Sequence, residues 1–242
     1  MNLLSKWKSN FLVGGLLGAC ALPLAWAQQP DPAALLQEIR QSSTSENMDL
    51  VGKIRKESLK EIEVRLFIRK NNIQFRLQEE LFHLRLGEGR ADLLTVTKEG
   101  SSMPFPGEKL RESIRGTDVT YEDFTLLFLY WPKPVLQGEE KVAGEDCFRL
   151  QLANPDDTGA YGSVTVWVHK RFRAFWKMRG FDRKGKALKE FQVQSVMQNP
   201  NGKGYALQSM RVNLLNDEGR VAAITYLTFE NQLPTGLVRP PK

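Results

Sequence analysis

The chain has 242 residues with 34 Lys and Arg against 28 Asp and Glu, a net charge of +6, and 41% hydrophobic residues. This length accommodates one or two domains with a sizeable core, and the mixed composition excludes a disordered acidic tail and a bundle of membrane helices. With 2 His and 2 Cys, the chain has little material for a metal cluster or a disulfide scaffold.

Residues 1–27 have the order of a secretory signal peptide. Lys6 and Lys8 are basic, residues 11–22 are apolar, and Ala25-Trp26-Ala27 has the small residues of a cleavage site. An apolar run of about 12 residues is shorter than the ~20 that span a bilayer, so a transmembrane anchor is not expected. We therefore predict export to the periplasm, with cleavage after Ala27.

A lipid-modified N-terminus is the alternative, because Leu17-Gly18-Ala19-Cys20 resembles a bacterial lipobox that would anchor the protein at Cys20. The apolar stretch before Cys20 is short and residues 21–26 stay apolar, so we favour Ala27. Cleavage there leaves Cys147 as the sole thiol, which excludes an intramolecular disulfide. Cys147 lies in a strand-like alternation, which favours a small core residue over a catalytic thiol.

The mature chain opens with a helix signal. Asp31 is a favoured N-cap and Pro32 a favoured first helical residue. Apolar residues at helical spacing follow, so we predict a short amphipathic helix over 32–41. The polar residues after it end the helix.

Period-two alternation follows, which is typical of antiparallel strands with one buried face. Because turn signals separate the runs and nearly all connections are short, sequence neighbours should pair. The pattern predicts a mainly β (α+β) fold built as a long, curved antiparallel meander of about eleven strands. These span roughly 47–56, 60–69, 72–78, 81–86, 91–98, 146–153, 164–169, 173–181, 188–197, 205–215 and 221–230.

One apolar segment interrupts the strands. Thr120 and Asp123 have the spacing of a capping box, and residues 124–130 continue as an apolar helix that Trp131-Pro132 ends. A helix that is apolar on most sides must be covered on most sides. We expect it to plug an open sheet or a barrel mouth.

No residue pattern argues for catalysis. His83 and His169 stand in no metal-ligand spacing, and Gly162-Ser163-Val164 begins a strand rather than a nucleophile elbow. Gly87-Glu88-Gly89-Arg90 is too short and too acidic to hold a phosphate. We therefore predict no catalytic residues, no metal and no cofactor, and a protein that is not an enzyme.

Positive charge concentrates in residues 170–189, where aromatic residues interleave with Lys and Arg. Export makes nucleic acid an improbable partner for this mixture. A hairpin with one solvated face is the simpler interpretation. The more specific interpretation is that Arg173, Lys177 and Arg179 form a rim that meets anionic lipid headgroups or an acidic partner.

Several segments resemble the LolA/LolB-like outer-membrane lipoprotein-sorting family, in its divergent LolA-like branch. They are Gly116-Thr117-Asp118-Val119-Thr120-Tyr121-Glu122-Asp123-Phe124, the strand entry at 141–148, the strand 164–168, and the hairpin 181–189. The resemblance covers roughly residues 45–232. The resemblance implies 45–232 as a lipid- or lipoprotein-binding domain, preceded by the lead and helix 28–44 and followed by the Pro-rich tail 233–242.

The same resemblance implies an unclosed half-barrel of about eleven strands, with lid helices over an apolar cavity. It implies a monomeric periplasmic carrier that shields acyl chains of lipoproteins or another lipid and works with the membrane surface or an envelope transport partner. The alternative is an envelope structural or regulatory interaction module without lipid transport. A lid-fastening arginine is expected on an early strand, with Arg55, Arg65 and Arg76 open as candidates.

The cavity residues expected from the alternation face one side of the strands, and the lid residues lie on the inserted helix. Alternation alone does not distinguish an open cavity from a filled core, so both interpretations stay open. The expected lipid-binding residues are Ile62, Val64, Leu66, Phe75, Leu77, Phe191 and Val193, with Phe124, Leu127 and Phe128 on the lid.

Overall fold

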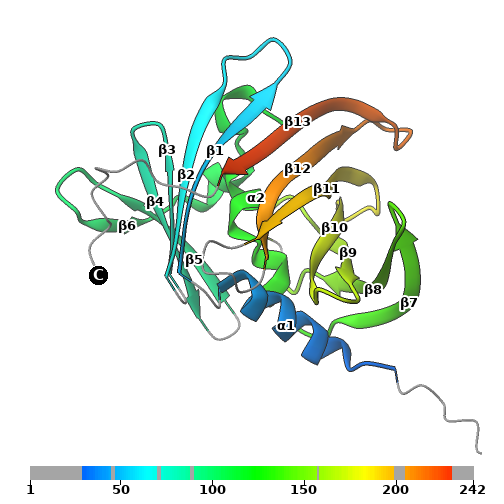
Figure 1. The fold of residues 1–242 in the computed structure, drawn as a ribbon. Helices are drawn as coiled ribbons and strands as arrows, with labels where there is room; N and C mark the ends of the chain where they lie inside the picture. The colour runs from blue at the N-terminus through cyan, green and yellow to red at the C-terminus, as the bar shows by residue number, and fades with distance from the viewer. Residues whose placement is uncertain are drawn as a thin grey trace, which may run out of the picture.

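The computed structural model describes residues 29–44, 47–69, 72–87, 90–156, 158–198 and 205–230. The predicted signal peptide with Cys20, and the Pro-rich tail 233–242, lie outside the described residues. Within them, a 13-stranded antiparallel sheet curves around an inserted segment, residues 105–134, with helix α1 along one end (Figure 1). The fold is mainly β and the sheet is unclosed, as predicted.

All eleven predicted strands are present, and two more join them at the sheet edges. The additional strands are β6 (Ser102–Pro104), which has three residues, and β7 (Val135–Val142), which is mostly exposed. The other strands are β1 (Met48–Lys56), β2 (Ile62–Arg69), β3 (Asn72–Leu77), β4 (Glu80–Gly87), β5 (Arg90–Val96), β8 (Glu145–Ala153), β9 (Ser163–His169), β10 (Ala174–Phe181), β11 (Ala187–Gln198), β12 (Tyr205–Leu215) and β13 (Val221–Glu230).

The strand order is β6-β5-β4-β3-β2-β1-β13-β12-β11-β10-β9-β8-β7. Sequence neighbours pair as predicted except β6 and β7, and the first and last strands also pair, with Val51 opposite Glu230 in the middle of the sheet. Strands β6 and β7 form the two edges. The inserted segment therefore connects one edge of the sheet to the other, and this places it against the inner face.

Period-two alternation divides the side chains between the two faces of the sheet. On β8, Phe148, Leu150 and Leu152 are buried in the main core on the inner face. Cys147 points to the other face and is also buried, in a small cluster with Trp167, as predicted for a core residue. Burial, followed by the neighbouring carboxylates, raises the pKa of the Cys147 thiol to about 11, so the thiol stays protonated at neutral pH.

Helix α1 (Pro32–Thr44) begins where Asp31 and Pro32 predict it. Asp31 Oδ1 accepts a hydrogen bond from the Ala33 amide at 3.1 Å. Leu35, Leu36 and Ile39 are almost fully buried, which fixes the helix against the inner side of the sheet. The helix ends three residues beyond the predicted residue 41.

The inserted segment contains one short α-helix and three 3-10 turns rather than the continuous helix predicted. The capping box is present: Thr120 Oγ1 accepts from the Asp123 amide, and Asp123 accepts from the Thr120 amide. Helix α2 (Tyr121–Thr125) then stops because Leu126 adopts the left-handed conformation, with φ of 47°. The 3-10 turns are η1 (Gly107–Arg111), η2 (Ile114–Gly116) and η3 (Leu127–Tyr130).

None of the helices in the described part of the chain is long and apolar enough to cross a membrane.

Candidate functional site

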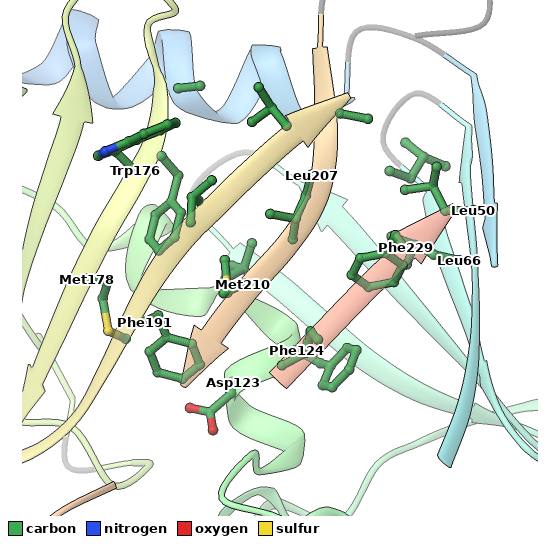
Figure 2. Close-up of a pocket in the computed structure, with 18 of the residues that line it drawn as sticks. Leu50, Leu66, Asp123, Phe124, Trp176, Met178, Phe191, Leu207, Met210 and Phe229 are labelled. Atoms are coloured by element: carbon green, nitrogen blue, oxygen red, sulfur yellow. The ribbon is translucent and has the colours of Figure 1, made fainter. Parts of the chain in front are cut away.

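An apolar cavity of about 410 Å³ lies between the inner face of the sheet and the inserted segment (Figure 2). This volume is within the range of about 300–1,000 Å³ that is typical of small-molecule sites. Among the described residues that line the cavity, Asp123 is the one that carries a charge. The lining comes from β1–β3 on one side, β10–β13 on the other, and α2 with η3 across them.

The structure places the predicted lipid-binding residues in two different settings. Leu66, Phe191 and Val193 line the cavity, and so do the predicted lid residues Phe124 and Phe128. The others lie elsewhere: Leu127 is half-buried outside the lining, and Ile62, Val64, Phe75 and Leu77 are at most 3% exposed in the packed core.

An aromatic stack explains why Phe75 does not reach the cavity. The Phe75 ring lies 5.0 Å from the ring of Phe82 and 5.0 Å from that of Phe124. Phe105 and Tyr121, which pack 4.8 Å apart, extend the stack. Large rings therefore fill the space around Phe75 on β3 and Phe82 on β4, and the hollow begins on the far side of Phe124.

None of the three predicted rim residues, Arg173, Lys177 and Arg179, lines the cavity. Met178 lines the cavity, so its neighbours Lys177 and Arg179 point to the outer face of β10, where both form ion pairs with Glu190 at 3.1 and 2.5 Å. Burial alone would raise the pKa of Glu190, but hydrogen bonds from Arg179 and Lys177 outweigh it and lower the pKa. Arg173 lies in the turn between β9 and β10, where its guanidinium is 3.7 Å from the Glu38 carboxylate and 5.3 Å from the ring centroid of Phe148.

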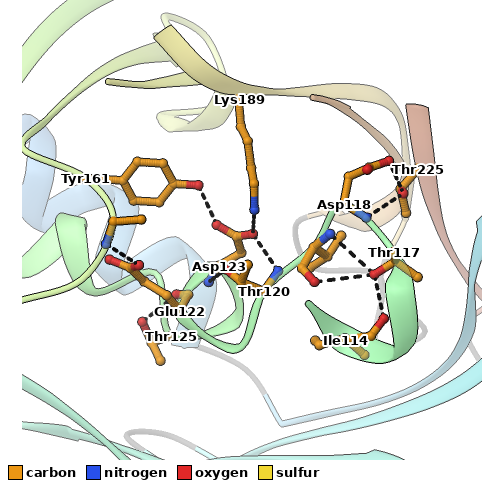
Figure 3. Close-up of polar contacts among 12 residues, drawn as sticks. Ile114, Thr117, Asp118, Thr120, Glu122, Asp123, Thr125, Tyr161, Lys189 and Thr225 are labelled. Carbon is orange, nitrogen blue, oxygen red and sulfur yellow. Dashed lines mark hydrogen bonds and ion pairs between the residues drawn. The ribbon is translucent and has the colours of Figure 1, made fainter. Parts of the chain in front are cut away.

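Asp123 closes one end of the cavity as part of a buried polar network (Figure 3). Its Oδ2 accepts from Lys189 Nζ at 2.8 Å and from the Thr120 amide at 2.7 Å, and its Oδ1 accepts from the Tyr161 hydroxyl at 2.6 Å. Burial, followed by the Asp123 charge, raises the pKa of Tyr161 well above its usual range. All three partners stabilise the charge, so the carboxylate anchors α2 to β11 through Lys189 and to the loop between β8 and β9 through Tyr161.

Asp118 forms a second anchor, at the seam between the first and last strands. Lys56 Nζ on β1 lies 2.7 Å from Asp118 Oδ1, and Thr225 on β13 donates to Asp118 Oδ2 at 2.8 Å. The side chain of Asp118 is 2% exposed. The motif at residues 116–124, which carries the family resemblance, thus holds the inserted segment to both halves of the sheet.

Arg40 on α1 is a site residue that sequence reasoning missed. Its Nε donates to the carbonyl oxygen of Leu129 at 2.7 Å, and its guanidinium lies 4.8 Å from the ring centroid of Tyr130. Burial lowers the pKa of Arg40 from its ordinary value. Because its partner is a backbone carbonyl 89 residues away, no local motif signals the contact.

In the part of the chain that the structure describes, the three arginines considered as lid fasteners form no hydrogen bond with the inserted segment. Arg55 and Arg76 are exposed, and Arg65 lies 4.0 Å from Glu63 on its own strand. In the described part of the chain, Arg40 is the arginine that joins α1 to η3. Since Leu129 lines the cavity, this contact holds α1 against the part of the inserted segment that bounds it.

Neither histidine lies in a metal site. His169 is buried, its Nδ1 accepts from the amides of Arg171 and Phe172, and its Nε2 lies 3.0 Å from Glu145. His83 Nε2 lies 3.0 Å from the Asn72 side chain, and burial lowers the pKa of its imidazole. Across the described ranges, no three His, Cys, Asp or Glu side chains are grouped to hold a metal ion.

Comparisons with known proteins agree with this architecture. A protein of the DUF1329 family from Desulfovibrio piger has a TM-score of 0.67 at 18% identity, covering 86% of this chain and 96% of its own. A putative outer membrane lipoprotein-sorting protein domain from Vibrio parahaemolyticus has a TM-score of 0.66 at 17% identity, covering 86% and 94%. A LolA superfamily protein from Nitrosomonas europaea has 0.60 at 16%, covering 85% and 96%.

These likenesses show that the chain shares the fold of these three structures, one of which is a LolA superfamily protein. A family model described as "Uncharacterized protein" matches residues 99–236, more than half of the chain, and the chain belongs to that family. No curated protein matches the chain.

Proposed function

We propose that the protein is a non-enzymatic carrier that shields an acyl chain of a lipid or lipoprotein in the apolar cavity. The observation that carries the proposal is an apolar cavity of about 410 Å³ in which Asp123, the one charged residue of its described lining, is already paired. Each CH₂ group transferred from water into such a lining contributes roughly 0.8 kcal/mol. An alkyl chain therefore binds without leaving a buried charge unpaired.

The fold supports this proposal, because one solved structure that shares it is described as a putative outer membrane lipoprotein-sorting domain. The proposal includes export by residues 1–27, with cleavage after Ala27, and action in the periplasm at the membrane surface or with an envelope transport partner. Residues 45–232 form the binding domain in this proposal.

Native mass spectrometry of the full chain, expressed with its own N-terminus and purified from a bacterial envelope, tests the carrier function. We expect co-purified lipid on the wild-type protein. Met210→Glu places a carboxylate in the lining, and Leu207→Trp narrows the cavity without adding charge, so each should remove the lipid. Val221→Glu, on an exposed position of β13, is the matched control and should keep it.

Circular dichroism and urea unfolding check that each variant folds. Wild-type protein that carries no lipid and takes up none from added vesicles would contradict the carrier function. The alternative function, an envelope protein-interaction module on the same fold, would then remain.

A further inference from the structure

The size of the cavity limits how much lipid it holds. Benzene fills an engineered protein cavity of ~150 Å³, which corresponds to roughly 25 Å³ for each carbon atom. On that ratio, the cavity of about 410 Å³ holds about 16 carbons, one saturated chain of common length. The two or three chains of a diacyl lipid or a lipoprotein exceed this volume while the inserted segment is in place.

The cavity has a closed end and an end that meets solvent. Asp123 and Phe124 on α2 lie at the closed end, while Trp176 and Leu207 lie toward the other (Figure 2). At the open end, the rings of Phe172 and Tyr205 pack 5.1 Å apart, and both line the cavity. Tyr205 is 54% exposed, so these two rings form the boundary between the apolar lining and water.

The turn between β9 and β10 places positive charge beside this boundary. Arg171 is exposed, and its guanidinium lies 5.5 Å from the ring centroid of Phe172. Lys170 is paired with Glu139 at 2.5 Å, and Arg173 with Glu38 at 3.7 Å. Among the described residues, no carboxylate lies within ion-pair distance of Arg171.

His169 fixes the shape of this turn. Its Nδ1 accepts from the Arg171 amide at 3.1 Å and from the Phe172 amide at 3.2 Å, and its ring packs 4.4 Å from the Phe172 ring. The imidazole is 3% exposed. The backbone that carries Arg171 is thereby held at the open end of the cavity.

We propose that the cargo is a single-chain anionic amphiphile, with its alkyl chain in the cavity and its carboxylate or phosphate at Arg171 beside Arg173. This inference rests on the proposed carrier function and names the class of lipid. A guanidinium binds either oxyanion with charge-assisted hydrogen bonds. The chain enters past Phe172 and Tyr205 and ends near Phe124.

Fluorescence of the full chain tests the proposal, because Trp176 lines the cavity. Bromine-labelled C16 chains that enter it should quench this tryptophan. The probes are brominated palmitate, 1-palmitoyl lysophosphatidylglycerol with a brominated chain, the brominated C16 alcohol, and a brominated two-chain phosphatidylglycerol. Native mass spectrometry gives the stoichiometry, and Trp176→Phe shows which part of the quenching comes from the cavity.

We expect one chain per protein and roughly fivefold tighter binding of the anionic single-chain probes than of the alcohol, as for a partly exposed ion pair. Arg171→Gln should abolish this preference while the alcohol binds unchanged. The matched control Arg220→Gln, in the exposed turn at the opposite end of β12, should keep it. Comparison of palmitate with the lysophospholipid distinguishes a carboxylate from a phosphate.

Equal binding of alcohol and palmitate to the wild type would overturn the anionic headgroup. Tight 1:1 binding of the two-chain lipid with the same Trp176 quenching would overturn the single chain. Either result leaves the carrier function intact. Failure of every probe to bind would instead contradict the carrier function itself.

Discussion

Two regions of the same inner face differ in how they are filled. Around Phe75 on β3 and Phe82 on β4, two rings stack at 5.0 Å, and Phe105 and Tyr121 of the inserted segment cover them. Under β10–β13, Val193 and Ala206 are small, and the rings of Phe128 and Phe175, which both line the space, lie 6.5 Å apart. The first region is a packed core and the second is the cavity.

The difference shows that alternation within strands determines which side chains face inward but not whether they meet a partner. The inserted segment decides that, because it presents aromatic rings to one half of the sheet and leaves the other half open. Phe124 marks the boundary, since it packs on Phe75 and also lines the cavity.

Truncation of one aromatic ring in each region should give the largest difference between the regions in the free energy of unfolding. Phe75→Ala should lower the free energy of unfolding by about 3–5 kcal/mol, because a fully surrounded ring is lost. Phe191→Ala should cost roughly half as much, since one side of Phe191 faces the cavity and makes no contacts there. Urea unfolding measures both, and equal losses would show that the second region is also packed.

Removal of the Asp123 charge at the closed end of the cavity should give the next largest effect on stability. Asp123→Asn leaves Lys189 without its buried partner, and the free energy of unfolding should fall by about 3 kcal/mol. Asp217→Asn removes an ion pair with Lys186 on the surface and is the control, with no measurable change expected. A change in the Asp123 variant as small as in the control would show that the network does not anchor the inserted segment.

The cover on the cavity should depend on Arg40, whereas the packed region should not. Arg40→Gln removes the bond to the Leu129 carbonyl, which should cost about 1 kcal/mol. Hydrogen exchange should accelerate at the amides of Leu129 and Trp131, which are bonded within η3, and stay unchanged in β4. Uniform acceleration across both regions would instead indicate global destabilisation.

The smallest expected effect is on the dependence of folding stability on pH. Burial raises the pKa of Glu122, although the Ala160 amide donates to it and opposes the shift. The folded protein therefore binds this proton more tightly than the unfolded chain does. Its contribution is fully present below the unfolded pKa, near 4.5, and is lost as pH rises through the raised folded value.

Glu122→Gln should remove that dependence on pH. The difference in urea midpoint between wild type and variant, followed from pH 4 to pH 8, isolates this carboxyl from the others. The variant should gain stability relative to the wild type as pH rises. A constant difference would show that Glu122 ionises as freely in the folded protein as in the unfolded chain.

The sequence predicted much of the sheet because alternation persists through eleven strands. It missed β6, which has three residues and ends at Pro104, and β7, whose exposed residues and irregularity near Gly138 hide the period. Hydrophobic periodicity also did not predict the pairing of β1 with β13, because the two strands are distant in sequence.

The candidate site was less predictable for a related reason. Phe191 and Val193 line the cavity while Phe75 and Leu77 do not, although all four have the same alternation. The distinction depends on Phe124, whose position follows from the left-handed turn at Leu126 and the anchors at Asp118 and Asp123. These are tertiary contacts that no local pattern records.

A crystal structure of the protein soaked with brominated palmitate tests the acyl-chain site most directly. The account predicts an anomalous bromine peak inside the cavity, within contact distance of Phe191 and Met210, with the aromatic stack around Phe75 unchanged. A cavity without bromine at saturating probe, or bromine bound only on the outer face, would contradict it.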